Sequence, residues 1–177
     1  RGWSRTKAPM IVMPANATGM FFHCLARETG RLGHLYSPGA ERGPWPWFPY
    51  ALDNGCFSLW DPALNHFDEK KWRDQGEAEW RRLLFWAAAA PQKPAWAIVP
   101  DWPGDWTATA RKYRDYVGEL TACGIPLAIA VQDGCTVRDV RNLTPTPAVV
   151  FVGGSTDWKW ATAENWIKSF SRVHVGR

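Results

Sequence analysis

The chain has 177 residues, of which 46% are hydrophobic and 21% charged, and this composition is sufficient for one domain with a sizeable core. Its net charge of +4 and its isoelectric point of about 9.0 are compatible with a polyanionic partner but do not require one. No run of about eighteen apolar residues occurs, and the first residues, RGWSRTKAPM, lack the apolar centre of a signal peptide, so the sequence indicates neither a membrane protein nor a secreted one.

The first third of the chain predicts short strands and one helix. A buried strand is expected at residues 9–14 (PMIVMP), and a helix over residues 17–30 that ends at Gly30. A second, weaker strand is expected at residues 31–37 (RLGHLYS). A loop rich in proline and tryptophan then leads to a short apolar run at residues 50–52 (YAL).

Asp53, Asn54 and Gly55 follow this apolar run directly, and two interpretations are open. These residue types are common in tight turns, so residues 57–60 (FSLW) could pair back on residues 49–52 as a hairpin. Alternatively, Asp53 stands at the carboxyl end of a strand in a parallel sheet, where its carboxylate would be available for chemistry.

The rest of the chain alternates helical segments with apolar runs. Amphipathic helices are expected over residues 68–90 and about 107–123. Continuous apolar runs, typical of strands covered on both faces, occur at 95–100, 125–131, 147–152 and 171–175. This repeat predicts an α/β fold of the (β/α)8 TIM-barrel type. Only six or seven strands fall within the chain, so we expect the barrel to be incomplete at its C-terminus.

In such a barrel the active site forms where the strands end and the loops begin. These positions hold two carboxylates, an amide, a glycine pair and a histidine: Asp53, Asp101, Gln132, Gly153, Gly154 and His174. Their convergence on one rim favours the second interpretation of Asp53. We expect His174 to be a rim or core histidine without a catalytic role.

Five short motifs resemble, in their order and spacing, the tRNA-guanine transglycosylase superfamily: LDNGCF, VPDWPGD, AVQDG, FVGGST and VHVGR. The resemblance extends from about Met10 to Arg177. It is closest to the queuine tRNA-ribosyltransferase-like branch that modifies DNA with deazapurines in phages and genomic islands. It implies one barrel-type domain over residues 1–177 that continues beyond residue 177, in the cytoplasm of a bacterial or phage-infected cell.

The resemblance implies a glycosyltransferase (pentosyltransferase) that exchanges guanine for a 7-deazaguanine base through a covalent link between an aspartate and the sugar. The acceptor would be DNA or tRNA, with DNA favoured because the zinc-binding region of the tRNA enzymes is absent from this sequence. Asp53 matches the family's general acid/base, and Asp101 matches its base-reading carboxylate. Gln132, Gly153 and Gly154 match its remaining base-contacting groups. The nucleophilic aspartate would follow residue 177, and Asn54 stands where the family has serine.

Each of these residues also has a structural explanation. Asp101 could start a turn and cap the next helix, a role for which Asp105 is an equal candidate. Gln132 could be an ordinary loop residue, and the glycine pair could only allow close packing of strand and helix. The chain would then be a non-catalytic protein that binds a purine, a deazapurine or a nucleotide, or an unrelated (β/α) hydrolase or isomerase.

Cysteine and tryptophan usage adds two expectations. The four cysteines form no CxxC pair and have no histidine at metal-ligand spacing, so we expect reduced thiols in a cytosolic protein, with no metal and no cofactor. Most of the thirteen tryptophans should pack in the core and at its edges. Trp102, Trp106 and Trp158 lie on the predicted rim loops, where indole rings could sandwich a base.

Overall fold

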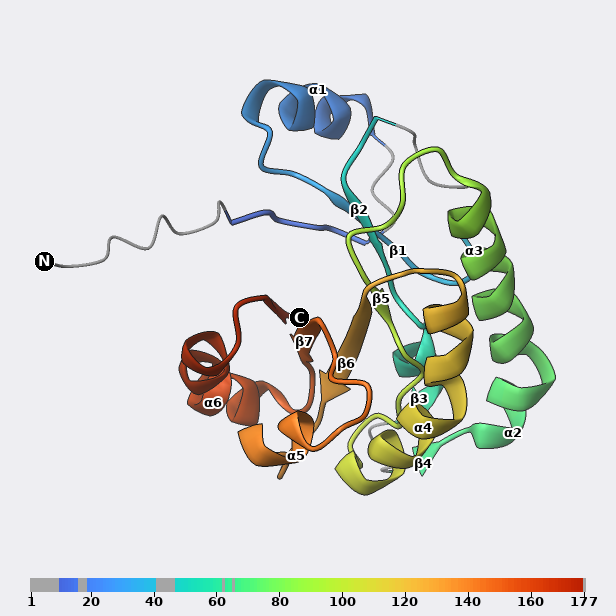
Figure 1. Cartoon of the computed structure of the whole chain (residues 1–177), viewed down its shortest axis with the longest axis vertical. Coiled ribbons are helices and arrows are strands. Elements are labelled where there is room, and N and C mark those ends of the chain that lie inside the picture. Colours follow the sequence, from blue (N-terminus) through green and yellow to red (C-terminus); the bar gives the residue numbers. More distant parts are fainter. Residues whose placement is uncertain (1–9, 16–18, 41–46, 62, 65, 177) are drawn as a thin grey trace, which may run out of the picture.

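The computed structural model describes residues 10–15, 19–40, 47–61, 63–64 and 66–176. Its centre is a six-stranded parallel sheet that curls into a half-barrel (Figure 1). The strand order is β1-β2-β5-β6-β7-β8, with a two-stranded hairpin, β3-β4, inserted between β2 and β5. The strands of the sheet are β1 (His34–Tyr36), β2 (Tyr50–Leu52), β5 (Ala97–Ile98), β6 (Leu127–Val131), β7 (Val149–Val152) and β8 (Val173–Val175). The chain therefore has a mixed α/β fold.

The inner strands β2, β5, β6 and β7 contain no charged residue or histidine, as expected where both faces of a sheet are covered. All five residues of β6 are buried. On one face, Val99 and Ile129 pack with side chains of the helices α3 and α4 in the larger core cluster. On the concave face, Ala51 and Ala128 belong to a second cluster with Trp96. Buried side chains are thus packed on both faces of the sheet.

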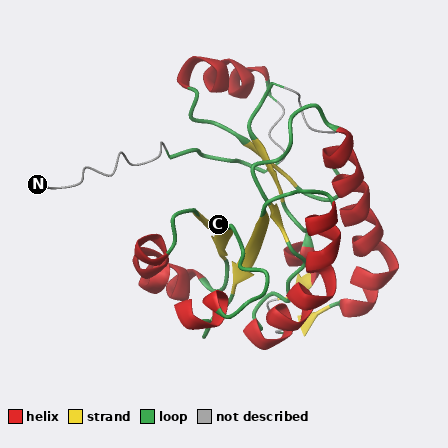
Figure 2. Cartoon of the chain, in the orientation of Figure 1, coloured by secondary structure: helices red, strands yellow, loops and turns green. Residues whose placement is uncertain are grey.

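Helices α3 to α6 cover the convex side of the sheet, and α1 lies beyond the amino-terminal ends of the strands (Figure 2). None of the helices in the described ranges is both long and apolar enough to cross a membrane. The helical elements are α1 (Met20–Thr29), η1 (Cys56–Leu59), α2 (Glu69–Lys71), η2 (Trp72–Gly76), α3 (Glu77–Ala89), α4 (Trp106–Ala122), α5 (Val137–Arg141) and α6 (Thr156–Ser169).

The helix predicted over residues 68–90 is present as the continuous run α2, η2 and α3. Its predicted amphipathic character is confirmed, since one face is buried and carries Trp72, Trp80, Leu83, Leu84 and Ala87. Its middle turn, η2, is π-helical. A Cβ atom on Gly76 would lie 2.7 Å from Cε3 of Trp72, so the indole of Trp72 crosses the backbone where that turn ends.

The strand predicted at residues 9–14 is wrong in its extent. Among residues 10–15, only Val12 and Ala15 form isolated parallel bridges, to Leu32 and Leu35. Val12 is 53% exposed and Met10 is 80% exposed, so this edge segment lacks the cover that holds the inner strands in place.

The hairpin interpretation of Asp53 is wrong. The preceding strand, β2, pairs in parallel with β1 and β5, and residues 56–59 form the 3₁₀-helix η1. Gly55 begins this turn with φ +74°, a left-handed conformation that suits glycine. The local hairpin comes later, where β3 (Trp60–Asp61) pairs antiparallel with β4 (His66–Phe67).

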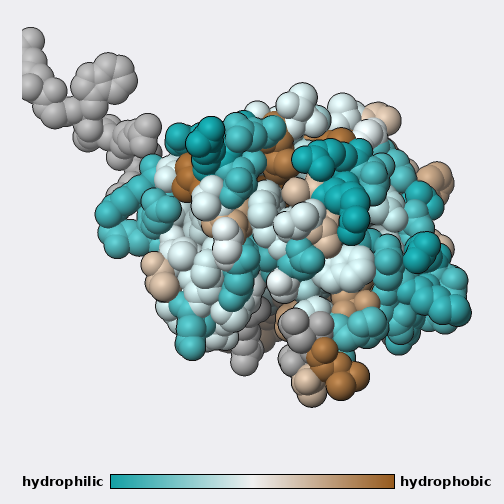
Figure 3. All heavy atoms as spheres, turned by 90° about the horizontal axis from the view of Figure 1, so that it is seen from below, coloured by the Kyte–Doolittle hydropathy of each residue, from teal (hydrophilic) through white to brown (hydrophobic). Residues whose placement is uncertain are grey.

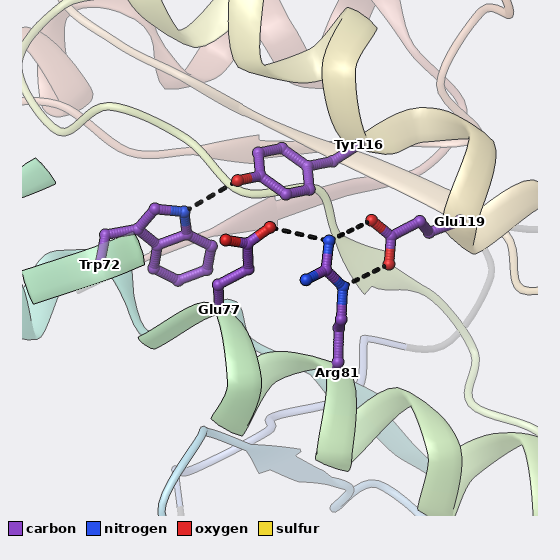
Figure 4. A network of polar contacts seen from close by, with 5 residues as sticks. All are labelled: Trp72, Glu77, Arg81, Tyr116 and Glu119. Carbon is purple, nitrogen blue, oxygen red and sulfur yellow. Dashed lines mark hydrogen bonds and ion pairs between the residues drawn. The ribbon is translucent and has the colours of Figure 1, made fainter. Parts of the chain in front are cut away.

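A polar network joins α3 to α4 on the outside of the half-barrel (Figure 4). The guanidinium of Arg81 forms ion pairs with Glu77 at 2.7 Å and with Glu119 at 2.8 Å. The indole N–H of Trp72 donates to the hydroxyl of Tyr116 at 3.1 Å. These contacts fix η2 and α3 against α4, which begins directly after one of the rim loops.

Candidate functional site

The predicted site residues lie at the carboxyl-terminal ends of the strands, on the side that Figure 3 views. Asp53 directly follows β2, Gln132 follows β6, and Gly153 follows β7. Asp101 lies beyond β5, after Val99 and Pro100. Because the sheet is parallel, these ends meet on one rim.

Asp53 is held at the end of β2 by backbone and side-chain hydrogen bonds. Its N–H donates to the carbonyl of Tyr36 at 2.7 Å, which continues the pairing with β1. The Ser37 hydroxyl donates to Oδ2 and the Asn54 N–H to Oδ1, both at 2.9 Å. Burial raises the pKa of Asp53, although the bonds from Ser37, Asn54 and the Gly55 backbone act in the opposite direction. Asp53 is therefore a half-buried residue whose carboxyl gains a proton more readily than usual.

Asp101 is the most deeply buried carboxyl of the rim, at 6% exposure. The side-chain amide of Asn54 donates to Oδ1 at 2.9 Å, and that of Gln132 donates to Oδ2 at 2.6 Å. Burial raises the pKa of Asp101 to about 6; the charge of Asp53 adds to the rise, and the bonds from Asn54 and Gln132 oppose it. Two carboxyl groups with raised pKa thus share one rim.

Gln132 joins three rim loops through its side-chain amide. Its Nε2 donates to Asp101, and its Oε1 accepts from the N–H groups of Gly104 at 3.2 Å and Gly154 at 3.1 Å. The other glycine of the pair, Gly153, donates its N–H to the carbonyl of Val131 at 3.0 Å. Both glycine N–H groups are therefore engaged within the protein.

Gly154 has a specific conformational requirement. Its φ is +73°, and a Cβ atom there would collide with Oδ1 of Asp133. The Asp133 carboxylate accepts from both the N–H and the hydroxyl of Ser155, each at 2.6 Å, and Ser155 caps α6. The glycine thus allows the β6 and β7 loops to approach closely.

The helix-capping alternative for Asp101 is wrong, because Asp105 caps α4. Oδ1 of Asp105 accepts from the N–H of Ala108 at 2.9 Å. The Asp101 carboxylate instead bonds Asn54 and Gln132, within the rim network. Of the two candidates in the VPDWPGD motif, the second stabilises the helix and the first belongs to the rim.

A buried lysine lies behind the rim. Lys112 on α4 is 6% exposed, and within the described part of the chain its Nζ forms no hydrogen bond or ion pair. Four rings surround this nitrogen at 5.3–5.8 Å from their centroids, those of Phe67, Trp72, Trp102 and Tyr116. Burial lowers the pKa of Lys112. The ring of Trp102 connects this aromatic group to the rim.

A pocket of about 410 Å³ opens beside the rim network. Three indoles line it, from Trp60, Trp102 and Trp106, together with the carboxylate-bearing residues Asp105 and Asp133. Asp53, Asp101 and Gln132 are outside its wall, and Gly104 is the wall residue that bonds Gln132. The pocket and the buried carboxylates are therefore adjacent but separate.

Two of the three predicted stacking tryptophans line the pocket, and one does not. Trp158 instead packs on Trp166 within α6, with ring centroids 6.2 Å apart. Trp60 replaces it in the wall, a residue that sequence reasoning missed. Trp60 was hard to predict from the sequence, because its place in the wall depends on the β3-β4 hairpin folding over the β5-α4 loop.

Two other residues, His174 and Cys56, have settings that bear on their expected roles. His174 stacks on Phe151 at 4.9 Å, and burial lowers its pKa to about 4. Cys56 is fully buried beside Asp101, and burial raises the pKa of its thiol. Within the described residues, no group of three histidine, cysteine, aspartate or glutamate side chains has the arrangement of a metal site.

Comparisons with models of protein families, with curated proteins and with solved structures gave no match for this chain. The family resemblance therefore rests on the five sequence motifs alone. In the rim network, Asn54, Asp101 and Gln132 meet from three separate loops.

Proposed function

We propose that this chain is a transglycosylase-like protein that exchanges guanine for a 7-deazaguanine base in nucleic acid, with DNA favoured over tRNA. In this proposal the half-barrel is part of a (β/α)8 barrel. Support for that part comes from a parallel sheet whose strands follow the chain order apart from one hairpin, and from the placement of the polar residues at the carboxyl ends of the strands.

The observation that carries the proposal is the setting of Asp101. A guanine edge presents the N1–H and the 2-amino group, which require a carboxylate acceptor. Each oxygen of Asp101 accepts one side-chain amide bond, from Asn54 or Gln132. Because an ionised carboxylate has about four lone-pair sites, acceptor capacity remains for a base. Adenine lacks this pair of donors, so the same carboxylate would select against it.

Asp53 has the properties of the proposed acid/base group. It is more exposed than Asp101, and a raised pKa favours a carboxyl that both gains and loses a proton during a reaction. The Ser37 hydroxyl and the Asn54 N–H fix the orientation of its carboxylate. The covalent step requires an aspartate nucleophile, and we assign neither Asp53 nor Asp101 to that role.

A non-catalytic base-binding protein is the second candidate, and one observation favours it. The two carboxylates of the indole-lined pocket are already bound to backbone or hydroxyl groups, Asp105 at Ala108 and Asp133 at Ser155. A pocket with stacking rings and engaged carboxylates is better suited to holding a ligand than to attacking it.

The first experiment is calorimetric titration of the chain with guanine and 7-cyano-7-deazaguanine, with adenine as the control ligand. Asp101→Asn should weaken binding of the first two by about 1 to 3 kcal/mol, the range for a charge-assisted hydrogen bond. Asp157→Asn is the matched control, because Asp157 is an exposed carboxylate on α6. Equal affinity for adenine, or an equal loss in both variants, would contradict base reading by Asp101.

Exchange is tested with labelled guanine and with DNA or tRNA acceptors on the full natural protein. Asp53→Asn should leave base binding largely intact and abolish exchange, because it removes only the acid/base group. Binding without exchange in the unmodified protein would favour the non-catalytic candidate. Loss of the fold in Asp53→Asn, with exchange retained by the folded fraction, would assign Asp53 a structural role only.

A further inference from the structure

The indole-lined pocket is large enough to hold a small molecule and is open to solvent. Its volume of about 410 Å³ falls within the range of small-molecule pockets. Trp60 comes from the β3-β4 hairpin, Trp102 comes from the loop between β5 and α4, and Trp106 is the first residue of α4. Asp133 and Gly134, from the loop after β6, also line the pocket. The three indoles therefore come from more than one segment of the chain.

The aromatic wall is held in place before any ligand arrives. The backbone N–H of Trp102 donates to the Thr109 hydroxyl at 2.9 Å, and that hydroxyl donates to the Trp102 carbonyl at 3.0 Å. The Trp102 ring also contacts Phe67, with centroids 5.0 Å apart. Gly104 has φ +78°, and a Cβ atom there would lie 2.9 Å from Cη2 of Trp60. The absence of a side chain at Gly104 thus lets the Trp60 indole lie against the loop.

The charges of the wall favour a base over a phosphate. Asp105 and Asp133 line the pocket, and no lysine or arginine is among the described residues of its wall. A phosphate inside the pocket would face two carboxylates without a cation. A nucleobase carries no charge, stacks on indole rings, and presents amino groups that carboxylate oxygens accept. The net charge of +4 would attract the phosphates to the protein elsewhere.

We propose that this pocket binds the base of a second nucleotide in a single-stranded nucleic acid, next to the nucleotide whose base is exchanged at the rim. This inference rests on the proposed function for the identity of the strand. The connection between the two sites is the hydrogen bond from the Gly104 N–H to Gln132, which also bonds Asp101. A strand would place one base at the carboxylates and a neighbouring base between the indoles.

The test measures the affinity of the chain for short, labelled single-stranded DNA by fluorescence anisotropy, with RNA and duplex DNA of the same sequence as further arms. Trp60→Ala and Trp106→Ala should each weaken single-strand binding by about 5- to 150-fold, the effect of losing one stacked base. Trp160→Ala is the matched control, because Trp160 lies on α6 and is 76% exposed. Thermal unfolding of each variant verifies that it is folded. If only one of the two pocket variants is folded, that variant alone is enough for the test.

The expected result is a loss confined to the two pocket variants, with weaker binding of the duplex. Unchanged affinity in both pocket variants, an equal loss in Trp160→Ala, or equal binding of duplex and single strand would each overturn the inference. The RNA arm distinguishes the source of the strand, because with a sequence that lacks thymine and uracil the two strands differ only in the sugar. Guanine titration of the same variants separates the two proposals. Guanine binding without strand binding overturns this inference alone, and strand binding through Trp60 without guanine binding overturns the proposed base exchange alone.

Discussion

Replacing Asp101 by asparagine should change how the stability of the protein depends on pH. The pKa of this buried carboxyl is raised from its usual 3.8 to about 6. A group whose pKa is higher in the folded than in the unfolded protein takes up protons on folding. Its stabilising contribution is therefore complete below about pH 4 and is lost as the pH rises through about 6. The difference between the two pKa values corresponds to about 3 kcal/mol.

The measurement is urea unfolding, followed by tryptophan fluorescence, of both proteins between about pH 4 and pH 7. The free energy of unfolding of the wild type minus that of Asp101→Asn should fall by about 2 kcal/mol across this range, because at pH 4 the carboxyl of the unfolded chain is already partly ionised. Histidines with lowered pKa, such as His174, change stability in the opposite direction, but they do so in both proteins and are removed by the subtraction. Asp157→Asn provides a control without a buried carboxyl.

A constant offset is expected as well. Asn54 and Gln132 both donate to Asp101, so an asparagine would place its own N–H₂ against one of these donors. This mismatch should cost about 1 to 3 kcal/mol at every pH. A difference that stays flat from pH 4 to pH 7, or that grows with pH, would refute the assignment of Asp101 as a buried carboxyl that protonates near neutrality.

Three further predictions concern stability. Burial lowers the pKa of His34 to about 4, so the unfolded chain binds a proton at this histidine more readily than the folded protein does. The free energy of unfolding should therefore decrease as the pH falls from about 6.5 to 4. His34→Phe should make this decrease smaller, as measured by the urea midpoint at each pH. Gly104→Ala should lower the free energy of unfolding by about 1 to 2 kcal/mol, because φ is +78° and the new Cβ would meet Trp60; an unchanged thermal midpoint would contradict this. Arg81→Ala should lower the free energy of unfolding by no more than about 1 kcal/mol, and by less at high salt, because Arg81 is half exposed beside Glu119. A decrease of several kcal/mol in urea unfolding would show that the α3-α4 network contributes more than surface ion pairs do.

The strands and their carboxyl ends were predictable because the relevant signals are local. A run such as residues 125–131 is apolar at every position, which indicates a strand covered on both faces, and β6 occupies 127–131. Gly30 ends α1 in the left-handed conformation, as its position after the helical pattern predicted. The parallel order then brought Asp53, Asp101 and Gln132 to one rim, where Asp101 and Gln132 are joined directly by a hydrogen bond.

The contacts that complete the site were not predictable, because they join residues far apart in the sequence. Asn54 reaches across to Asp101, and from the sequence it was only a departure from the family's serine. Ser37, at the end of β1, orients Asp53 from the neighbouring strand. The reach of Trp60 into the pocket depends on a hairpin whose strands are two residues each, too short for any periodicity to reveal.

The orientation of the Gln132 amide links the two proposed sites. Its Oε1 accepts from Gly104 and Gly154, so rotating the amide by half a turn would place Nε2 against two N–H donors and Oε1 against the Asp101 carboxylate. Both contacts would become repulsive, and the amide is therefore held in one orientation. A base that hydrogen-bonds to Asp101 changes the acceptor to which Gln132 donates. Gln132 in turn accepts from the Gly104 N–H, in the loop against which the Trp60 indole lies. We therefore expect occupancy of the rim to change affinity at the pocket, and by linkage the pocket to change affinity at the rim by the same factor.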